Sequence, residues 1–199
     1  MNSKEEIWET PLYQMLQTLD SHKDPWQQLE RLKKFDNLPP EQFDELTSGK
    51  YIKHEEAAIV MQYLPVEWLI PKLPSLLGHL MDGNWPASKR ISDLLTSIGA
   101  PLLSEIKRVF QTDKNDGIWL NNIIRGIVGH WNNSLISELK HELFEVVNYA
   151  EHEGASISAL EVLKRILPPQ EFEKLYSYLK DKYANNTSLI HDLLYAFDR

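Results

Sequence analysis

The chain has 199 residues, of which 42% are hydrophobic and 25% are charged, as is typical of a globular protein with a substantial core. It contains no cysteine, so disulfides and thiolate metal sites are excluded. The net charge of -8 at pH 7 opposes binding to nucleic acid, whose phosphates it repels, and favours a basic protein partner.

Membrane and secretion signals are not found in the sequence. Residues 1–14 contain acidic side chains and lack the apolar core of a signal peptide. No apolar run approaches the ~20 residues that a bilayer-spanning helix requires. We therefore expect a cytoplasmic protein that binds neither membranes nor a cofactor.

The first half of the chain shows helical periodicity with short turns. A first helix is predicted to begin near Ser3, because Glu6 follows three residues later in a capping-box arrangement. Pro11 lies within its apolar stripe and either kinks this helix or resets its start. Trp68 and Leu69 are expected in a turn. Further helices are predicted over residues 25–35, 40–47, 53–64 and 71–81.

The second half continues the same pattern. Helices are predicted over residues 84–98, 101–110, 117–129, 134–147, 156–167, 169–179 and 187–197. Asn84 is expected to cap the first of these helices, and Asn133 or Ser134 the fourth. Ser156 or Ser158 is expected to begin the fifth helix.

These elements predict an all-α fold, a right-handed α–α superhelix of HEAT-like antiparallel helical hairpins. We expect one α-solenoid domain over residues 1–199, with helical caps at 1–45 and 168–199 around a HEAT-like core at 46–167. An Asp precedes a Trp by three residues both at Trp85 and at Trp119, 34 residues later. This offset is in the range of helical-hairpin repeats, so the two Trp residues are expected at equivalent places.

Three motifs resemble those of a bacterial domain family of unknown function with HEAT-like helical repeats. They are Lys53-His54-Glu55, the Leu-rich stretch ending in Asp82-Gly83-Asn84-Trp85-Pro86, and Asp116-Gly117-Ile118-Trp119. Family members have an Asp where Glu55 stands here. The resemblance covers about residues 46–167. It implies a fold of helical repeats and carries over no established activity.

The motif residues are the first candidates for a binding site. They are His54, Asp82, Asn84, Trp85, Asp116 and Trp119. Asp and Asn also cap helices, Trp fills gaps between hairpins, and histidine is common at a helix start, so we favour structural roles for these residues. An alternative is a metal-dependent or hydrolytic enzyme in which His54 and Asp82 share a polar pocket.

A second set of candidates lies on one predicted helix. Glu138, Glu142 and Glu145 recur at spacings of four and three residues, which predicts a solvated acidic face. No metal is expected here, because the segment His141 to Glu145 lacks the second histidine of the HExxH zinc motif. Between residues 138 and 161 the chain has six acidic residues against Lys140 alone, which suits a basic partner.

The sequence contains no phosphate-binding glycine loop and no nucleophile elbow, so no catalytic residue is predicted. We expect a non-enzymatic protein–protein interaction module, and its sharpest version is a toxin-neutralising, immunity-type protein. The hydrolytic enzyme stays open as one alternative. Another is a structural or regulatory subunit, a monomer or weak homodimer that buries residues such as Trp26 or Tyr176.

Overall fold

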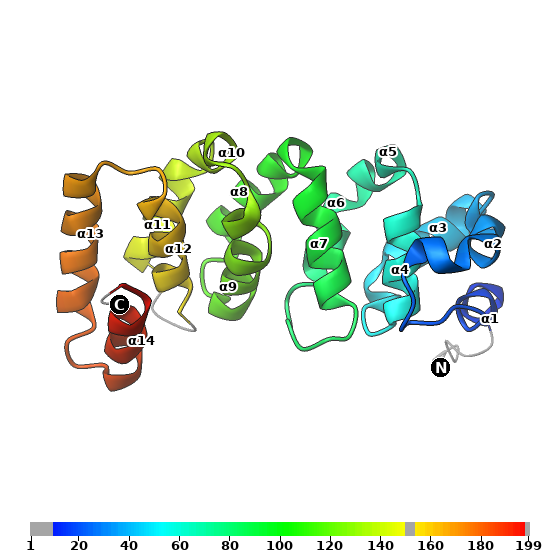
Figure 1. Cartoon of the computed structure of the whole chain (residues 1–199), viewed down its shortest axis with the longest axis horizontal. Helices are drawn as coiled ribbons and strands as arrows, with labels where there is room; N and C mark the ends of the chain where they lie inside the picture. Colours follow the sequence, from blue (N-terminus) through cyan, green and yellow to red (C-terminus); the bar gives the residue numbers. More distant parts are fainter. Residues whose placement is uncertain (1–9, 150–153, 198–199) are drawn as a thin grey trace. The chain divides into compact units, whose positions relative to one another are not determined.

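The computed structural model describes residues 10–149 and 154–197, and all regular elements in these ranges are helices. The all-α class predicted from the sequence is therefore confirmed. The predicted helix start near Ser3 lies outside the described residues. The chain divides into two compact units, Met1–Ile98 and Gly99–Arg199, called unit 1 and unit 2 below and described separately. Figure 1 labels their helices.

Unit 1 consists of short α-helices joined by 3₁₀ turns. In chain order they are α1 (Pro11–Leu16), η2 (Pro25–Gln28), α2 (Leu29–Leu32), η3 (Lys33–Phe35), α3 (Pro40–Thr47), η4 (Gly49–Tyr51), α4 (Glu55–Tyr63), α5 (Val66–Leu69), η5 (Ile70–Lys72), α6 (Leu73–Gly78) and α7 (Ser88–Ile98).

Helix α1 begins at Pro11, so this proline sets the start of the helix. The side chain of Thr10 accepts a hydrogen bond from the amide of Tyr13 at 3.2 Å, which satisfies an amide without a helical partner. Proline is favoured at the first helical position, because its missing N–H is not needed there. Leu12 and Leu16 are the buried residues of this helix.

Two local predictions in unit 1 are wrong. Trp68 and Leu69 lie in the one-turn helix α5 rather than in a turn. Pro65 takes the N-cap position before this helix, so the proline does not interrupt it. Asn84 does not cap α7, which begins only at Ser88. The Ser88 hydroxyl donates to the carbonyl of Asp82 at 2.9 Å, which closes the loop before the helix begins.

The core of unit 1 is organised around α4, which packs against α7. Five consecutive residues of α4, Ala57 to Met61, are fully buried, so this helix is covered on all sides. At its start, Glu55 forms an ion pair with Nε of Arg90 on α7 at 2.8 Å. Arg90 also donates from Nη2 to the carbonyl of Ser21 at 2.9 Å, so one guanidinium ties three segments together.

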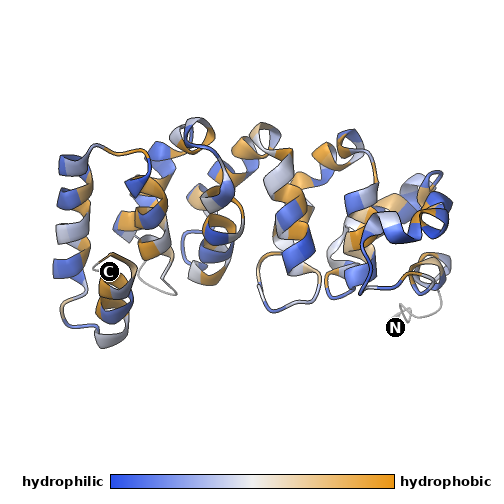
Figure 2. Ribbon diagram, viewed as in Figure 1, coloured by the Kyte–Doolittle hydropathy of each residue, from blue (hydrophilic) through white to orange (hydrophobic). Residues whose placement is uncertain are grey.

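Unit 2 has longer helices. They are η6 (Ala100–Leu102), α8 (Leu103–Thr112), α9 (Gly117–Gly126), η7 (Val128–His130), α10 (Asn133–Ser137), α11 (Lys140–Tyr149), α12 (Ala155–Lys164), α13 (Pro169–Lys182) and α14 (Thr187–Phe197). Most carry both hydrophilic and hydrophobic residues, as Figure 2 shows. None of the described helices has the length and apolar character that crossing a membrane requires.

The central element of unit 2 is α12, which contacts α9, α11, α13 and α14. Its first six residues, Ala155 to Leu160, are all buried. Gly154 precedes it with φ of +71° in the left-handed region, where a residue with a Cβ is strained. The helix therefore begins at Ala155, and the predicted start at Ser156 or Ser158 is wrong, because both serines are buried within it.

The helix predicted over residues 134–147 is two helices, α10 and α11. Its predicted cap is also wrong. Asn132, rather than Asn133 or Ser134, has extended backbone and accepts a hydrogen bond from the amide of Leu135 at 3.0 Å. The sequence offers three adjacent residues that can cap a helix, and the backbone conformation decides among them.

Candidate functional site

The residues of the first Asp-Trp motif form a turn in unit 1. Oδ1 of Asp82 accepts a hydrogen bond from the amide of Asn84 at 2.9 Å, and the Asp82 carbonyl accepts from the amide of Trp85 at 3.2 Å. The side chain of Asn84 is exposed and that of Trp85 is half-buried. Asp82 thus holds the loop that leads to α7.

The second Asp-Trp motif, in unit 2, has a different conformation. Asp116 caps α9, and its Oδ1 accepts from the amide of Trp119 at 2.9 Å. Trp119 lies inside the helix and is only 7% exposed. Trp85 instead lies in a turn before its helix, so the expected equivalence of the two Trp residues is wrong.

The ring of His54 packs against two tyrosines at the start of α4. It meets the rings of Tyr13 and Tyr51 edge-on, each with a centroid distance of 5.6 Å. In residues 10–149 and 154–197, no group of three or more histidine or acidic side chains is placed to hold a metal ion. His54 is therefore placed by aromatic packing, and neither it nor Asp82 belongs to such a group.

The predicted acidic face of α11 is wrong at Glu142. This side chain is only 7% exposed, and its Oε1 lies 3.8 Å from Nζ of Lys107 on α8. Glu138 is exposed and lines the same depression of about 470 Å³. The full lining is Lys107, Ser137, Glu138, Lys140, His141, Glu142 and Phe144. Two lysines therefore stand among the carboxylates, and the surface is not uniformly acidic.

Glu145 is exposed and acts on a neighbouring tyrosine instead of lining this depression. Burial raises the pKa of Tyr149 to about 12, and the negative charge of Glu145 adds to the shift. The Tyr149 hydroxyl donates to the carbonyl of Phe110 at 2.6 Å. This protonated phenol ties the end of α11 to α8.

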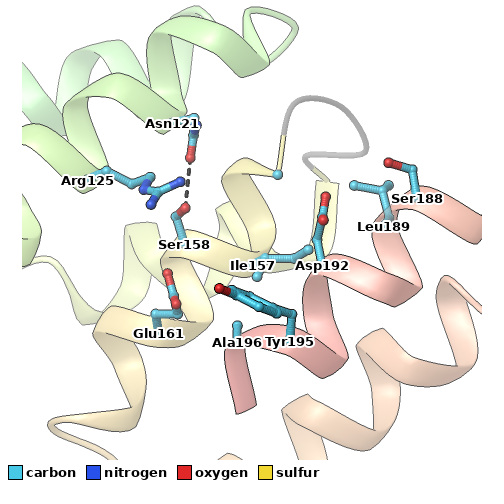
Figure 3. A pocket seen from close by; sticks show the side chains of 11 residues that line it. Asn121, Arg125, Ile157, Ser158, Glu161, Ser188, Leu189, Asp192, Tyr195 and Ala196 are labelled. Carbon is cyan, nitrogen blue, oxygen red and sulfur yellow. Dashed lines mark hydrogen bonds between the residues drawn. The ribbon is translucent and has the colours of Figure 1, made fainter. Parts of the chain in front are cut away.

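A polar cavity of about 750 Å³ in unit 2, which we call the α12 groove, is lined by residues from three helices (Figure 3). Its described lining is Asn121 and Arg125 of α9, Gly154, Ile157, Ser158 and Glu161 at α12, and Ser188, Leu189, Asp192, Tyr195 and Ala196 of α14. The groove is open to solvent.

Ser158 is the most buried polar group of the α12 groove. Its hydroxyl donates to Oδ1 of Asn121 at 2.7 Å, drawn as the dashed line in Figure 3. An amide oxygen is not basic enough to remove the hydroxyl proton. The pair therefore fastens α12 to α9 and does not prepare Ser158 for nucleophilic attack.

Four exposed side chains of the α12 groove are charged or aromatic, and a fifth, Ser188, carries a hydroxyl. Arg125, Glu161 and Asp192 are exposed and come from three different helices. Tyr195 is 59% exposed, and it lines the same pocket as Ile157, as labelled in Figure 3. These side chains offer a guanidinium, two carboxylates and a phenol to a molecule that enters the groove.

A smaller cavity of about 230 Å³ shares Arg125, Ser158 and Glu161 with the α12 groove and adds His130 and Arg165. Nη1 of Arg165 donates to the carbonyl of Gly129 at 2.7 Å, and its Nη2 to that of Trp131 at 2.6 Å. The Arg165 guanidinium is thus held by the backbone at the end of η7. Arg165 is exposed, as is Arg125, but two backbone hydrogen bonds fix the direction of its guanidinium.

Sequence reasoning did not find the α12 groove. The sequence did contain one indication of it. Ser156 and Ser158 lie among apolar residues in α12, and a buried polar side chain needs a hydrogen-bond partner. Their partners, Tyr183 and Asn121, are 27 and 37 positions away in the chain. Periodicity cannot identify such pairs.

Comparisons with curated proteins and with solved structures gave no match to this chain. The sequence model of a family described as "Domain of unknown function (DUF5071)" matches residues 50–167. The match includes both Asp-Trp motifs and the segment from α4 to α12. The chain therefore belongs to the DUF5071 family, as its Lys-His-Glu and Asp-x-Asn-Trp-Pro motifs predicted.

Proposed function

We propose that this protein is a non-enzymatic protein-binding module whose partner docks on the α12 groove. The observation that carries the proposal is the combination of exposed Tyr195 and Arg125 on an open groove of about 750 Å³. Tyrosine and arginine are among the residues that contribute most to protein–protein affinity. A groove spanning α9, α12 and α14 presents them on rigid helices.

The chemistry of the groove supports binding more than catalysis. A serine nucleophile requires a base within hydrogen-bond reach, and Ser158 donates to an amide oxygen instead. The described lining of the groove contains no histidine. Its carboxylates, Glu161 and Asp192, are exposed on different helices, without the burial that usually prepares an acid or base for catalysis.

The proposed partner is a basic protein. The chain has a net charge of -8, which accelerates encounter with a positively charged partner. The sharpest version is a toxin-neutralising, immunity-type protein in the cytoplasm. The proposal includes the finer architecture expected from the sequence, HEAT-like hairpins in a right-handed superhelix, since such repeats carry binding side chains without disturbing their core.

The experiment is affinity capture from the native host followed by quantitative binding of the recovered protein. Arg125→Ala and Tyr195→Ala are each expected to weaken binding by about tenfold or more, as for interface hot spots. The matched control is Tyr178→Ala, which removes a tyrosine 43% exposed on α13 and outside the groove. Equal losses in all three variants would reject the α12 groove as the docking site, and recovery of no stoichiometric partner would reject the function.

A second candidate is a structural or regulatory homo-oligomer, and exposed apolar residues of unit 1 favour it. Trp26 is 72% exposed, Met81 46%, Leu29 43% and Trp68 42%. Exposed apolar side chains of this size mark an interaction surface where they form one contiguous patch. Tyr176, the other residue named from the sequence, is only half-exposed in unit 2.

A further inference from the structure

Three aromatic rings of unit 2 surround a cavity of about 430 Å³, which we call the aromatic cavity. Phe172 and Tyr176 of α13 stack with ring centroids 6.1 Å apart. Phe197 of α14 lies 5.5 Å from the first ring and 5.6 Å from the second. The remaining lining is Lys164, Leu167, Pro169 and Glu173. Among the residues that the structure describes, none lines both the aromatic cavity and the α12 groove.

A cation already occupies the faces of two of these rings. The ammonium nitrogen of Lys164 lies 5.4 Å from the centroid of Phe172 and 5.2 Å from that of Phe197. Both distances are within the range in which the negative ring face attracts a cation. The rings are therefore arranged as a receptor for a positive group, and the chain supplies that group itself.

Lys164 is suited to leave the aromatic cavity. It is exposed at the last position of α12, and its ammonium ends a flexible four-carbon stem. Glu173 is an exposed carboxylate in the same lining, so negative charge remains beside the rings when Lys164 turns away. A second cation from outside can thus replace the first without leaving the aromatic faces unpaired.

We propose that the aromatic cavity recognises an arginine side chain of a basic protein partner, which displaces the ammonium of Lys164. A guanidinium stacks on aromatic faces and is more weakly hydrated than an ammonium, so it gains more from the same rings. Glu173 then offers a carboxylate to the fork of N–H donors. The inference rests on the proposed function for the identity of the partner, but its chemistry can be tested without that partner.

The first experiment titrates the full chain with Nα-acetyl-arginine methylamide and follows aromatic resonances by NMR. The matched ligand is Nα-acetyl-citrulline methylamide, which has nearly the same shape and no charge. The arginine compound is expected to shift the resonances of Phe172, Tyr176 and Phe197, and the citrulline compound is not. Equal shifts with both ligands, or no shift with either, would overturn the proposal.

The second experiment uses variants of the full chain. Lys164→Gln removes the internal competitor, so the dissociation constant of the arginine compound is expected to fall by about two- to fivefold. Tyr176→Leu keeps an apolar side chain but removes a ring face, and should weaken binding by a similar factor. Lys174→Gln is the charge control, because this lysine is exposed on α13 and does not line the cavity.

Thermal unfolding of each variant shows whether the fold is retained. Equal affinity of the Lys164→Gln and Lys174→Gln proteins would show that Lys164 does not compete for the site, and would overturn the inference. Failure of the proposed function has a different signature, which is the absence of a protein partner in the capture experiment. The two results are therefore distinguishable.

Discussion

His79 is a fully buried histidine in unit 1, and neither of its ring nitrogens has a hydrogen-bond partner among residues 10–149 and 154–197. Burial lowers its pKa from 6.5 to about 4, because the charged imidazolium loses its hydration. The backbone groups of Thr47 and Ser48 lie near the ring and act to raise the pKa, but neither forms a hydrogen bond with a ring nitrogen. The His79 side chain is therefore neutral in the folded protein at neutral pH.

The stability of unit 1 is expected to fall as the pH is lowered from about 6.5 to about 4. In this window the unfolded chain binds a proton at His79 and the folded chain does not, so acid favours unfolding. The difference of 6.5 minus about 4 corresponds to a loss on the order of 3 kcal/mol, which levels off below pH 4. Urea unfolding at pH 7, 5.5 and 4 measures it.

His79→Leu should remove most of this pH dependence, since leucine has no proton to bind. The control is His141→Gln, in which an exposed histidine is lost and the slope should persist. An unchanged slope in His79→Leu would show that other groups cause the acid sensitivity.

The second group of predictions concerns the residues at helix termini. Asn132→Ala should lower the free energy of unfolding by about 1 kcal/mol, because the alanine cannot accept from the amide of Leu135. Ser134→Ala changes an exposed residue that the sequence made an equal candidate for the cap, and should have an effect near zero. Urea unfolding of both proteins is the measurement, and a larger loss at Ser134 would contradict the cap assignment.

Gly154→Ala should destabilise the start of α12 by about 1 kcal/mol. The cost is conformational, because φ is +71° while no heavy atom of the described residues lies within 4 Å of the added Cβ. Gly49→Ala is the matched control, since its Cβ also meets nothing within 4 Å and its φ is not positive. Equal unfolding midpoints for the two variants would exclude strain at Gly154.

On the scale of the whole molecule, the exposed apolar residues of unit 1 predict self-association if the homo-oligomer candidate is right. Sedimentation of the wild-type chain over a hundredfold concentration range should then show a rising average mass. Trp26→Ser should reduce the association, because it removes a tryptophan that is 72% exposed. Tyr178→Ser in unit 2 serves as the control. A strict monomer at all concentrations would eliminate this candidate.

Family membership and most helices could be predicted from the sequence, since both depend on local patterns. Pro40 and Pro169 begin helices where they were expected to, because proline favours the first helical position whatever surrounds it. Pro11 also begins a helix, which is one of the two roles that the sequence left open for it. The three motifs likewise predicted membership of a family of unknown function, and the DUF5071 model matches residues 50–167.

The candidate site was predicted less well, for a physical reason. The environments of Glu142 and Ser158 depend on residues from other helices, Lys107 and Asn121, at distant positions in the chain. A helical pattern shows which side of its own helix a residue occupies, but not whether another helix covers it. Glu142 was thus predicted to be solvated, whereas the structure buries it.

The sequence by itself therefore determined the helical class, the acidic charge and the family, which follow from periodicity, composition and short motifs. Only the tertiary structure decided that Asp82 closes a turn while Asp116 caps a helix, although both precede a Trp by three residues. It also decided that Arg125 and Tyr195 share one groove. Helix packing sets burial and proximity, and packing is a property of the folded chain as a whole.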